Sequence, residues 1–112
     1  MTDSPAVLAQ LMQVILDRKL ARPANSYTTK LLDEGLPAIG PKVTEEAAEV
    51  VEAAGELGSP GHDHLVREAA DLVYHLFVLL AWRDVGLDEV EAELARRFGI
   101  SGLDEKASRQ QK

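Results

Sequence analysis

The sequence predicts an all-α fold, a small antiparallel bundle of four or five helices in one domain that covers residues 1–112. A chain of 112 residues fits a single domain and leaves little room for a second. Apolar residues recur at spacings of three and four along most of the chain, as they do in amphipathic helices. No segment shows the alternation of apolar and polar residues that marks a half-buried strand.

The first helix is predicted from an apolar stripe near the N-terminus. Its members recur at i, i+3, i+4, i+7 and i+8, which places them on one helix face; they are Leu8, Leu11, Met12, Ile15 and Leu16. Asp3 or Ser4 is a suitable N-cap, and Pro23 lies at or just beyond the end of the helix. A second, short helix is expected over about 26–34, with Gly35 as its terminator.

The third and fourth helices are expected to form an antiparallel hairpin. The third begins after Gly40-Pro41 and ends at Gly58. The segment 58–61, with the sequence Gly-Ser-Pro-Gly, is predicted to be a turn. The fourth helix then covers about 64–84. Because the connection is tight, the two helices should lie side by side.

A fifth helix is expected to begin at Asp88, with Glu91 three residues later completing a capping box. Its apolar stripe lies on one face and comprises Val90, Leu94 and Phe98. Gly99 closes this helix. The polar tail of about 101–112 is expected to be loose at its end.

The charge balance and the lack of cysteine exclude several classes of protein. Lys and Arg total 12 and Asp and Glu total 19, so the formal net charge is 12 − 19 = −7. This argues against a binder of nucleic acid or anionic membranes, which needs an excess of cations. Without cysteine there is no disulfide, thiolate zinc site or cysteine nucleophile. The longest apolar stretch, 69–82, has 14 residues, fewer than the ~20 that span a bilayer. No targeting pattern is visible, and we expect a cytoplasmic protein.

Three polar residues share one strip of the fourth helix, which is otherwise apolar. Glu68 and His75 fall about 60° and about 40° from Asp71 on a helical wheel. Asp71 and His75 have two interpretations: they form a pair in the core whose polar groups bond to each other, or they are part of a functional site. A helix that is apolar on all sides is buried in a core or between subunits. So short a chain has few helices to cover it, and a homodimer that forms a larger bundle would do so.

The third helix carries glutamates that the hairpin places opposite the acids of the fourth. Glu46 borders the apolar face, and Glu49 lies about 60° further out; Glu68 and Asp71 are expected to face them. Taken alone, a run of glutamates is more often a solvated face. Carboxylates about 6 Å apart repel by roughly 3 kcal/mol at an effective dielectric of about 20. Four of them in one seam therefore favour either protonation or a bound cation.

An all-oxygen ligand set suits a hard cation. Glu46, Glu49, Glu68 and Asp71 are the predicted ligands of Mg²⁺, with Mn²⁺ as the alternative ion. His75 is predicted either to orient these ligands from behind or to be a core histidine bonded to Asp71.

The acidic pattern resembles the metal-binding motif of the MazG-like all-α nucleoside triphosphate pyrophosphatases. It reads Glu45-Glu46-x-x-Glu49, a gap of 18 residues, and then Glu68-x-x-Asp71. Further stretches extend the resemblance over nearly the whole chain to the phosphoribosyl-ATP pyrophosphatase family of histidine biosynthesis. They are 26–32, 42–51, 68–76 and 101–109.

The resemblance implies hydrolysis of 1-(5-phosphoribosyl)-ATP to 1-(5-phosphoribosyl)-AMP and pyrophosphate at the α–β phosphate linkage. It also implies that the ion supplies the positive charge that an acidic protein needs to bind a triphosphate. Glu45 is the candidate for positioning the attacking water. Lys30 and Lys42 are candidate phosphate contacts, although each fits an ordinary surface position equally well. Family members often carry a lysine in place of Pro41 and a glycine in place of Thr44.

Two other interpretations of the function remain open from the sequence. One is a house-cleaning pyrophosphatase of the same superfamily that acts on ordinary or damaged nucleotides. The other is a non-catalytic helical interaction module whose acids are only solvated. The stretches 26–28 and 101–109 favour the phosphoribosyl-ATP substrate, because general MazG-like proteins need only the acids. The resemblance, like the apolar fourth helix, also points to a homodimer.

Overall fold

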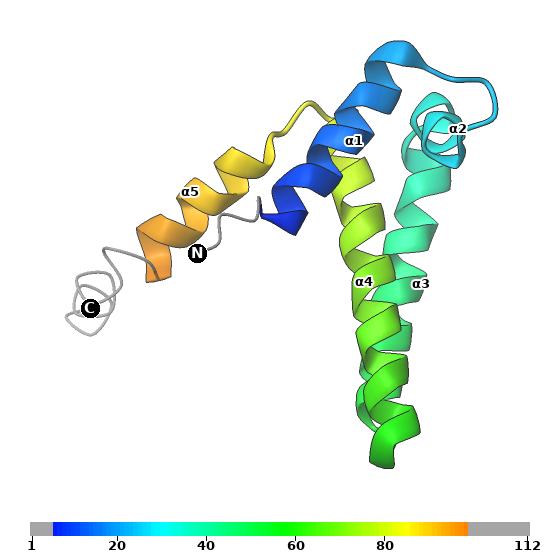
Figure 1. The fold of residues 1–112 in the computed structure, drawn as a ribbon, viewed down its shortest axis with the longest axis vertical. Helices are drawn as coiled ribbons and strands as arrows, with labels where there is room; N and C mark the ends of the chain where they lie inside the picture. Colours follow the sequence, from blue (N-terminus) through cyan, green and yellow to red (C-terminus); the bar gives the residue numbers. More distant parts are fainter. Residues whose placement is uncertain (1–5, 99–112) are drawn as a thin grey trace.

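The structure, a computed structural model, describes residues 6–98. Over this range it contains helices and no strand, which confirms the all-α prediction (Figure 1). The five helices are α1 (Val7–Ala21), α2 (Tyr27–Glu34), α3 (Leu36–Ala54), α4 (Gly58–Trp82) and α5 (Leu87–Phe98). The predicted N-caps Asp3 and Ser4, the stop at Gly99 and the tail lie outside the described residues.

The α3–α4 hairpin is the long axis of the molecule, as Figure 1 shows. Helices α1 and α2 pack against one end of this hairpin, where α2 contacts both of its helices. Helix α5 leads away from the hairpin (Figure 1). None of the helices within residues 6–98 is long and apolar enough to cross a membrane.

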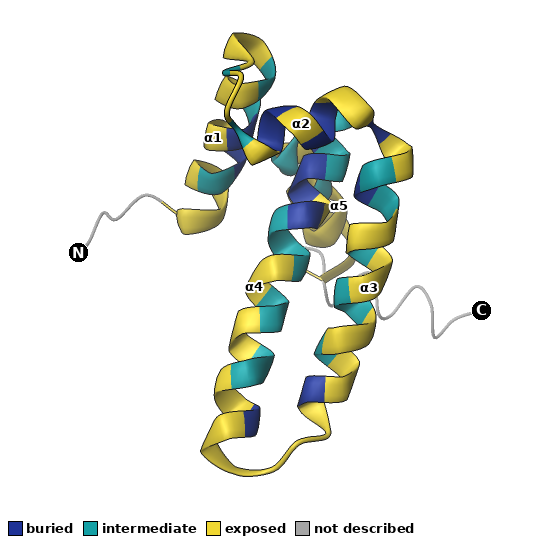
Figure 2. Ribbon diagram, turned by 90° about the vertical axis from the view of Figure 1, so that its right-hand side faces the viewer, coloured by how far each residue is buried: buried dark blue, intermediate teal, exposed yellow. Residues whose placement is uncertain are grey.

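The hydrophobic core lies at the end of the hairpin that α1 and α2 cover (Figure 2). Four helices contribute its buried residues, which are Met12, Ile15, Leu31, Leu32, Ile39, Phe77, Val78 and Ala81. Tyr74 and Trp82 are partly buried against this cluster. Tyr74, Phe77 and Trp82 therefore all pack in or against the core.

Local signals explain the predicted and observed limits of α1 and α2. Helix α1 ends where Arg22 adopts a left-handed conformation (φ 53°), just before Pro23. The Ser26 side chain caps α2 by accepting a hydrogen bond from the Thr29 N–H at 3.1 Å. Gly35 separates α2 from α3 with φ 74°, a conformation that favours glycine.

The predicted start of the third helix is wrong, because α3 begins at Leu36 and Pro41 lies inside it. Proline inside a helix removes one hydrogen bond and costs about 3 kcal/mol. The helix nevertheless continues through Pro41, since Ile39 is fully buried on the same helix. Tertiary packing outweighs the local signal of Gly40-Pro41 at this point.

The predicted turn at 58–61 is also wrong. Helix α3 ends at Ala54, residues 55–57 form the connection, and α4 begins at Gly58. Pro60 fits the first turn of α4 because the N–H groups of that turn have no partner within the helix. At Gly61 a Cβ would lie 2.5 Å from the carbonyl oxygen of Glu56, so the two segments pack more closely than another side chain would allow.

Helix α5 begins close to the predicted position but is capped differently. The Glu89 carboxylate accepts a hydrogen bond from the Gly86 N–H at 2.9 Å. The side chain that caps the start of α5 is therefore that of Glu89 and not that of Glu91. No residue of α5 is buried, and Leu94 of the predicted apolar stripe is 51% exposed. Within the helix, Arg96 and Arg97 pair with Glu93 and lower its pKa to about 2.

Candidate active site

The acids of the predicted metal site lie on facing parts of α3 and α4. The side chains of Glu46 and Glu68 are largely buried, at 13% and 17% exposure, whereas Glu49 and Asp71 are exposed. Glu49 and Glu68 meet across the hairpin: hydrogen bonding to Glu68, and then charge repulsion from it, raise the pKa of Glu49. Two carboxyl groups in contact favour either a shared proton or a nearby cation.

His75 is buried and holds Glu46 of the facing helix. Its Nδ1 lies 2.6 Å from Glu46 Oε1 and 3.2 Å from the backbone oxygen of Asp71. An ionised carboxylate only accepts hydrogen bonds, so Nδ1 carries the hydrogen that it donates to Glu46. In the neutral ring, Nε2 then accepts a hydrogen bond from the hydroxyl of Tyr27, 3.0 Å away. A chain of hydrogen bonds thus runs from α2 through α4 to α3.

The core-histidine interpretation named Asp71 as the partner of His75, and the structure changes that partner. The contact with Asp71 is to its backbone oxygen, and the carboxylate partner is Glu46. A helical wheel places His75 and Asp71 on one strip of α4 but carries no information about the side chain that faces them from α3.

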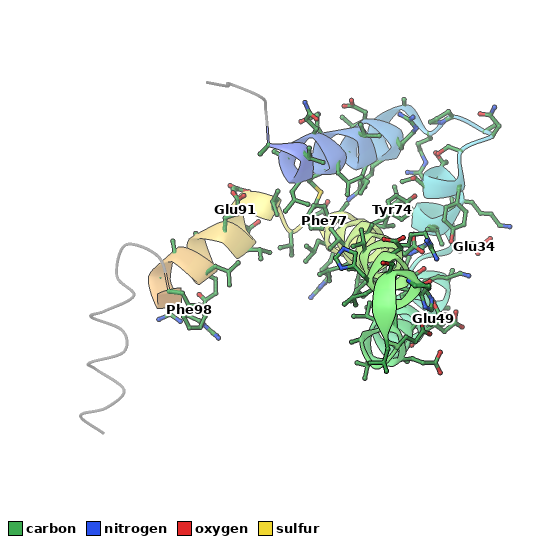
Figure 3. All side chains as sticks on the ribbon, turned by 60° about the horizontal axis from the view of Figure 1, so that its bottom comes forward. Glu34, Glu49, Tyr74, Phe77, Glu91 and Phe98 are labelled. Carbon is green, nitrogen blue, oxygen red and sulfur yellow. The ribbon has the colours of Figure 1, made fainter. Side chains whose placement is uncertain are left out.

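Aromatic rings surround this hydrogen-bonded chain. The Tyr27 ring lies 5.8 Å from His75 and the Tyr74 ring lies 4.9 Å from it, both edge to face. The Tyr74 hydroxyl also bonds to that of Thr28, and burial raises the pKa of Tyr74. These contacts fasten α2 onto α4 beside Glu46. Figure 3 places Tyr74 and Glu49 on the hairpin, apart from Glu91 and Phe98 of α5.

A second histidine, His64, was not among the predicted site residues. Its Nδ1 lies 3.0 Å from one carboxylate oxygen of Glu56 and 3.1 Å from the other, and its Nε2 lies 3.3 Å from Glu68 Oε2. The hydrogen bond to Glu56 is the largest cause that raises the pKa of His64. The spacing of four residues between His64 and Glu68 on one helix was the signal that could have identified it.

The remaining predicted residues lie on exposed positions. Glu45 is exposed on α3, and its charge contributes to the raised pKa of Glu49. Lys42 is exposed on α3, one turn before Glu46. Lys30 is exposed on α2 in a surface hollow that Arg22 and Thr29 also line.

The carboxylates fit a hard cation by their chemistry, although they are not arranged around a common point. Within residues 6–98, no three acidic or histidine side chains converge closely enough to hold an ion as they stand. Glu46 and Glu68 each contact a histidine, and Glu49 also contacts Glu68. Ion binding needs these side chains to turn, and the four-ligand set stays a prediction.

Comparison with known proteins gives a consistent result over nearly the whole chain. The family model described as "Phosphoribosyl-ATP pyrophosphohydrolase" matches residues 8–98. A phosphoribosyl-ATP pyrophosphatase of Rhodopirellula baltica is 54% identical over 109 residues, 97% of this chain and 91% of the relative. The protein of the same name from Trichlorobacter lovleyi is 51% identical over 112 residues, 99% of this chain and 100% of the relative.

The match begins at the second residue of α1, extends to the end of α5, and includes the four acids, His64 and His75. It therefore supports an enzyme and removes the alternative of a non-catalytic interaction module. This chain belongs to the phosphoribosyl-ATP pyrophosphohydrolase family, a family of hydrolases.

Proposed function

We propose that this protein hydrolyses 1-(5-phosphoribosyl)-ATP to 1-(5-phosphoribosyl)-AMP and pyrophosphate, the second step of L-histidine biosynthesis, in the cytoplasm. The observation that carries the proposal is the 51% identity to a phosphoribosyl-ATP pyrophosphatase along that relative's entire length. Water adds to the phosphorus atom of the α-phosphate, the bond to the bridging oxygen breaks, and pyrophosphate leaves.

Glu46, Glu49, Glu68 and Asp71 are proposed to hold Mg²⁺, and Mn²⁺ is a suitable substitute. Support comes from the contact between Glu49 and Glu68, which a divalent cation would relieve. When bound, the ion supplies positive charge to the triphosphate and makes a water molecule more acidic.

The other side chains have roles that follow from their positions. Glu45 is proposed to position the attacking water, since it lies on α3 next to Glu46 and influences Glu49 electrostatically. His75 holds Glu46 through its Nδ1 hydrogen. Lys30 and Lys42 are proposed to contact substrate phosphates, because both residues are exposed.

A homodimer is proposed as the functional assembly. The half of the hairpin near its turn exposes apolar side chains that no helix of residues 6–98 covers: Val51 is 73% exposed, Leu57 90% and Val66 57%. A second copy of the chain, packed against this half, would bury them and form a larger bundle.

Release of pyrophosphate from purified protein tests the proposed reaction. With Mg²⁺ present, we expect phosphoribosyl-ATP to be hydrolysed with a kcat/KM at least about 100-fold above that for ATP or dATP. Phosphoribosyl-AMP should appear in equal amount. Similar values for all three nucleotides would instead indicate a house-cleaning pyrophosphatase and overturn the proposed substrate.

A further inference from the structure

We propose that His64 is a positioning residue that holds the Glu68 carboxylate at the acidic site and is itself anchored by Glu56. This inference rests on the proposed function, because it gives Glu68 the role of an ion ligand. His64 does not touch substrate or ion in this proposal, and it acts through Glu68.

Both ring nitrogens of His64 are engaged, and in opposite directions. Nδ1 is hydrogen-bonded to the Glu56 carboxylate at 3.0 Å, and Nε2 lies 3.3 Å from Glu68 Oε2 as an ion-pair contact. The ring therefore cannot rotate without breaking a contact. Since His64 contacts Oε2 of Glu68, turning that carboxylate would break this contact.

The anchor is itself held by the backbone around the α3–α4 connection. The N–H of Glu56 donates to the carbonyl oxygen of Ala53 at 3.0 Å. Gly61 packs so closely that a Cβ there would lie 2.5 Å from the Glu56 carbonyl oxygen. Glu56 thus occupies a defined position, although its side chain is 44% exposed.

The arrangement repeats the one at Glu46. There His75 links the carboxylate to Tyr27, and here His64 links Glu68 to Glu56. A histidine that orients a ligating group through one nitrogen and is fixed through the other is a common support of metal sites, and its loss lowers metal affinity by about 10- to 100-fold.

Mn²⁺ binding to the full chain, followed by electron paramagnetic resonance, tests the proposal. We expect His64→Ala to weaken Mn²⁺ binding by about tenfold, and His64→Gln to recover part of it, because the amide can donate to Glu68. His62→Ala is the matched control: His62 is exposed and lies on a different face of α4, about 200° from His64.

Kinetics separate positioning from a general loss of structure. His64→Ala should raise the Mg²⁺ concentration needed for half-maximal activity and leave kcat at saturating Mg²⁺ and the ion-free melting temperature nearly unchanged. If His64→Ala lowers the melting temperature, Glu56→Gln replaces it, and it should weaken Mn²⁺ binding by a smaller factor in a folded protein.

The outcomes are distinguishable. If the unmodified protein binds no Mn²⁺, the proposed ion site fails and the role of His64 with it. If the unmodified protein binds Mn²⁺ and both His64→Ala and Glu56→Gln bind it equally well, the positioning role fails while the ion site stands. Equal weakening by His62→Ala also overturns the proposal, since the effect is then not specific to the contact with Glu68.

Discussion

The two ends of the α3–α4 hairpin differ in what lies over them (Figure 2). At the end covered by α1 and α2, Ile39, Val78 and Ala81 are 0% exposed. At the turn end, Val51 and Val66 are 73% and 57% exposed. Both ends carry apolar side chains, so composition does not separate them. Within residues 6–98, the other helices are thus enough to cover only one half of the α3–α4 hairpin.

The acidic site lies across the boundary between these two halves. Its support on the core side is His75, whose side chain is 9% exposed, and its support on the turn side is His64, at 29%. Glu46 is therefore fixed within packed structure, whereas Glu68 is fixed by a contact that water can reach. A second copy over the turn end would make the two supports more alike.

The largest expected effect comes from the acids themselves. Glu46→Gln and Asp71→Asn should each lower kcat/KM by about 100-fold or more, because each removes a negative charge from the ion site. The far-ultraviolet circular dichroism spectrum should remain that of a helical protein, since both replacements keep the size and shape of the side chain. Activity near that of the unmodified protein in both variants would refute the ligand assignment.

A change at the core end should be expressed as lost stability. Ile39→Ala removes a fully buried side chain and should lower the free energy of unfolding by about 2–5 kcal/mol. Urea titration at several protein concentrations measures this, with Val51→Ala as the matched change on the same helix. A cost for Ile39→Ala no greater than that for Val51→Ala would break the contrast between the two ends.

A change at the turn end should be expressed as lost assembly. Val66→Asp places a charge on the exposed apolar surface and should shift a dimer towards monomer at micromolar concentration. The effect on an isolated subunit is expected to stay within about 0.5 kcal/mol. Light scattering during size-exclusion chromatography distinguishes the species. A monomer for the unmodified protein would contradict the proposed homodimer.

Helical periodicity predicted α1, α3 and α5, whose apolar residues recur at helical spacing. Helix α2 was predicted from its terminator Gly35, and the hairpin from the tight connection between its helices. The boundaries failed where proline and glycine were interpreted locally. Pro41 lies inside α3 and Pro60 inside the first turn of α4. Ile39, on the same helix as Pro41, is fully buried by packing against residues distant in the sequence, and Pro60 is compatible with the first turn of a helix.

For the candidate site, the sequence could predict which residues share a face of one helix, but not which side chains they contact on another. The hairpin was expected to place Glu46 and Glu49 opposite Glu68 and Asp71, and of these acids Glu49 and Glu68 are in contact. The partner of His75 and the role of His64 depend on side chains from other segments, Glu46 and Glu56. The angular position of a residue on its own helix does not determine these cross-segment contacts.

The close packing of Gly61 against Glu56 has a consequence for any redesign of this protein. A single methyl group at position 61 would push the connection outwards, because the Glu56 backbone occupies that space. Glu56 would move with the connection. Because His64 contacts both Glu56 and Glu68, the displacement would be passed on to Glu68, about two helical turns from Gly61. A conservative-looking replacement at the tip of the hairpin would thus displace Glu68, a proposed ion ligand, without replacing any of the acids.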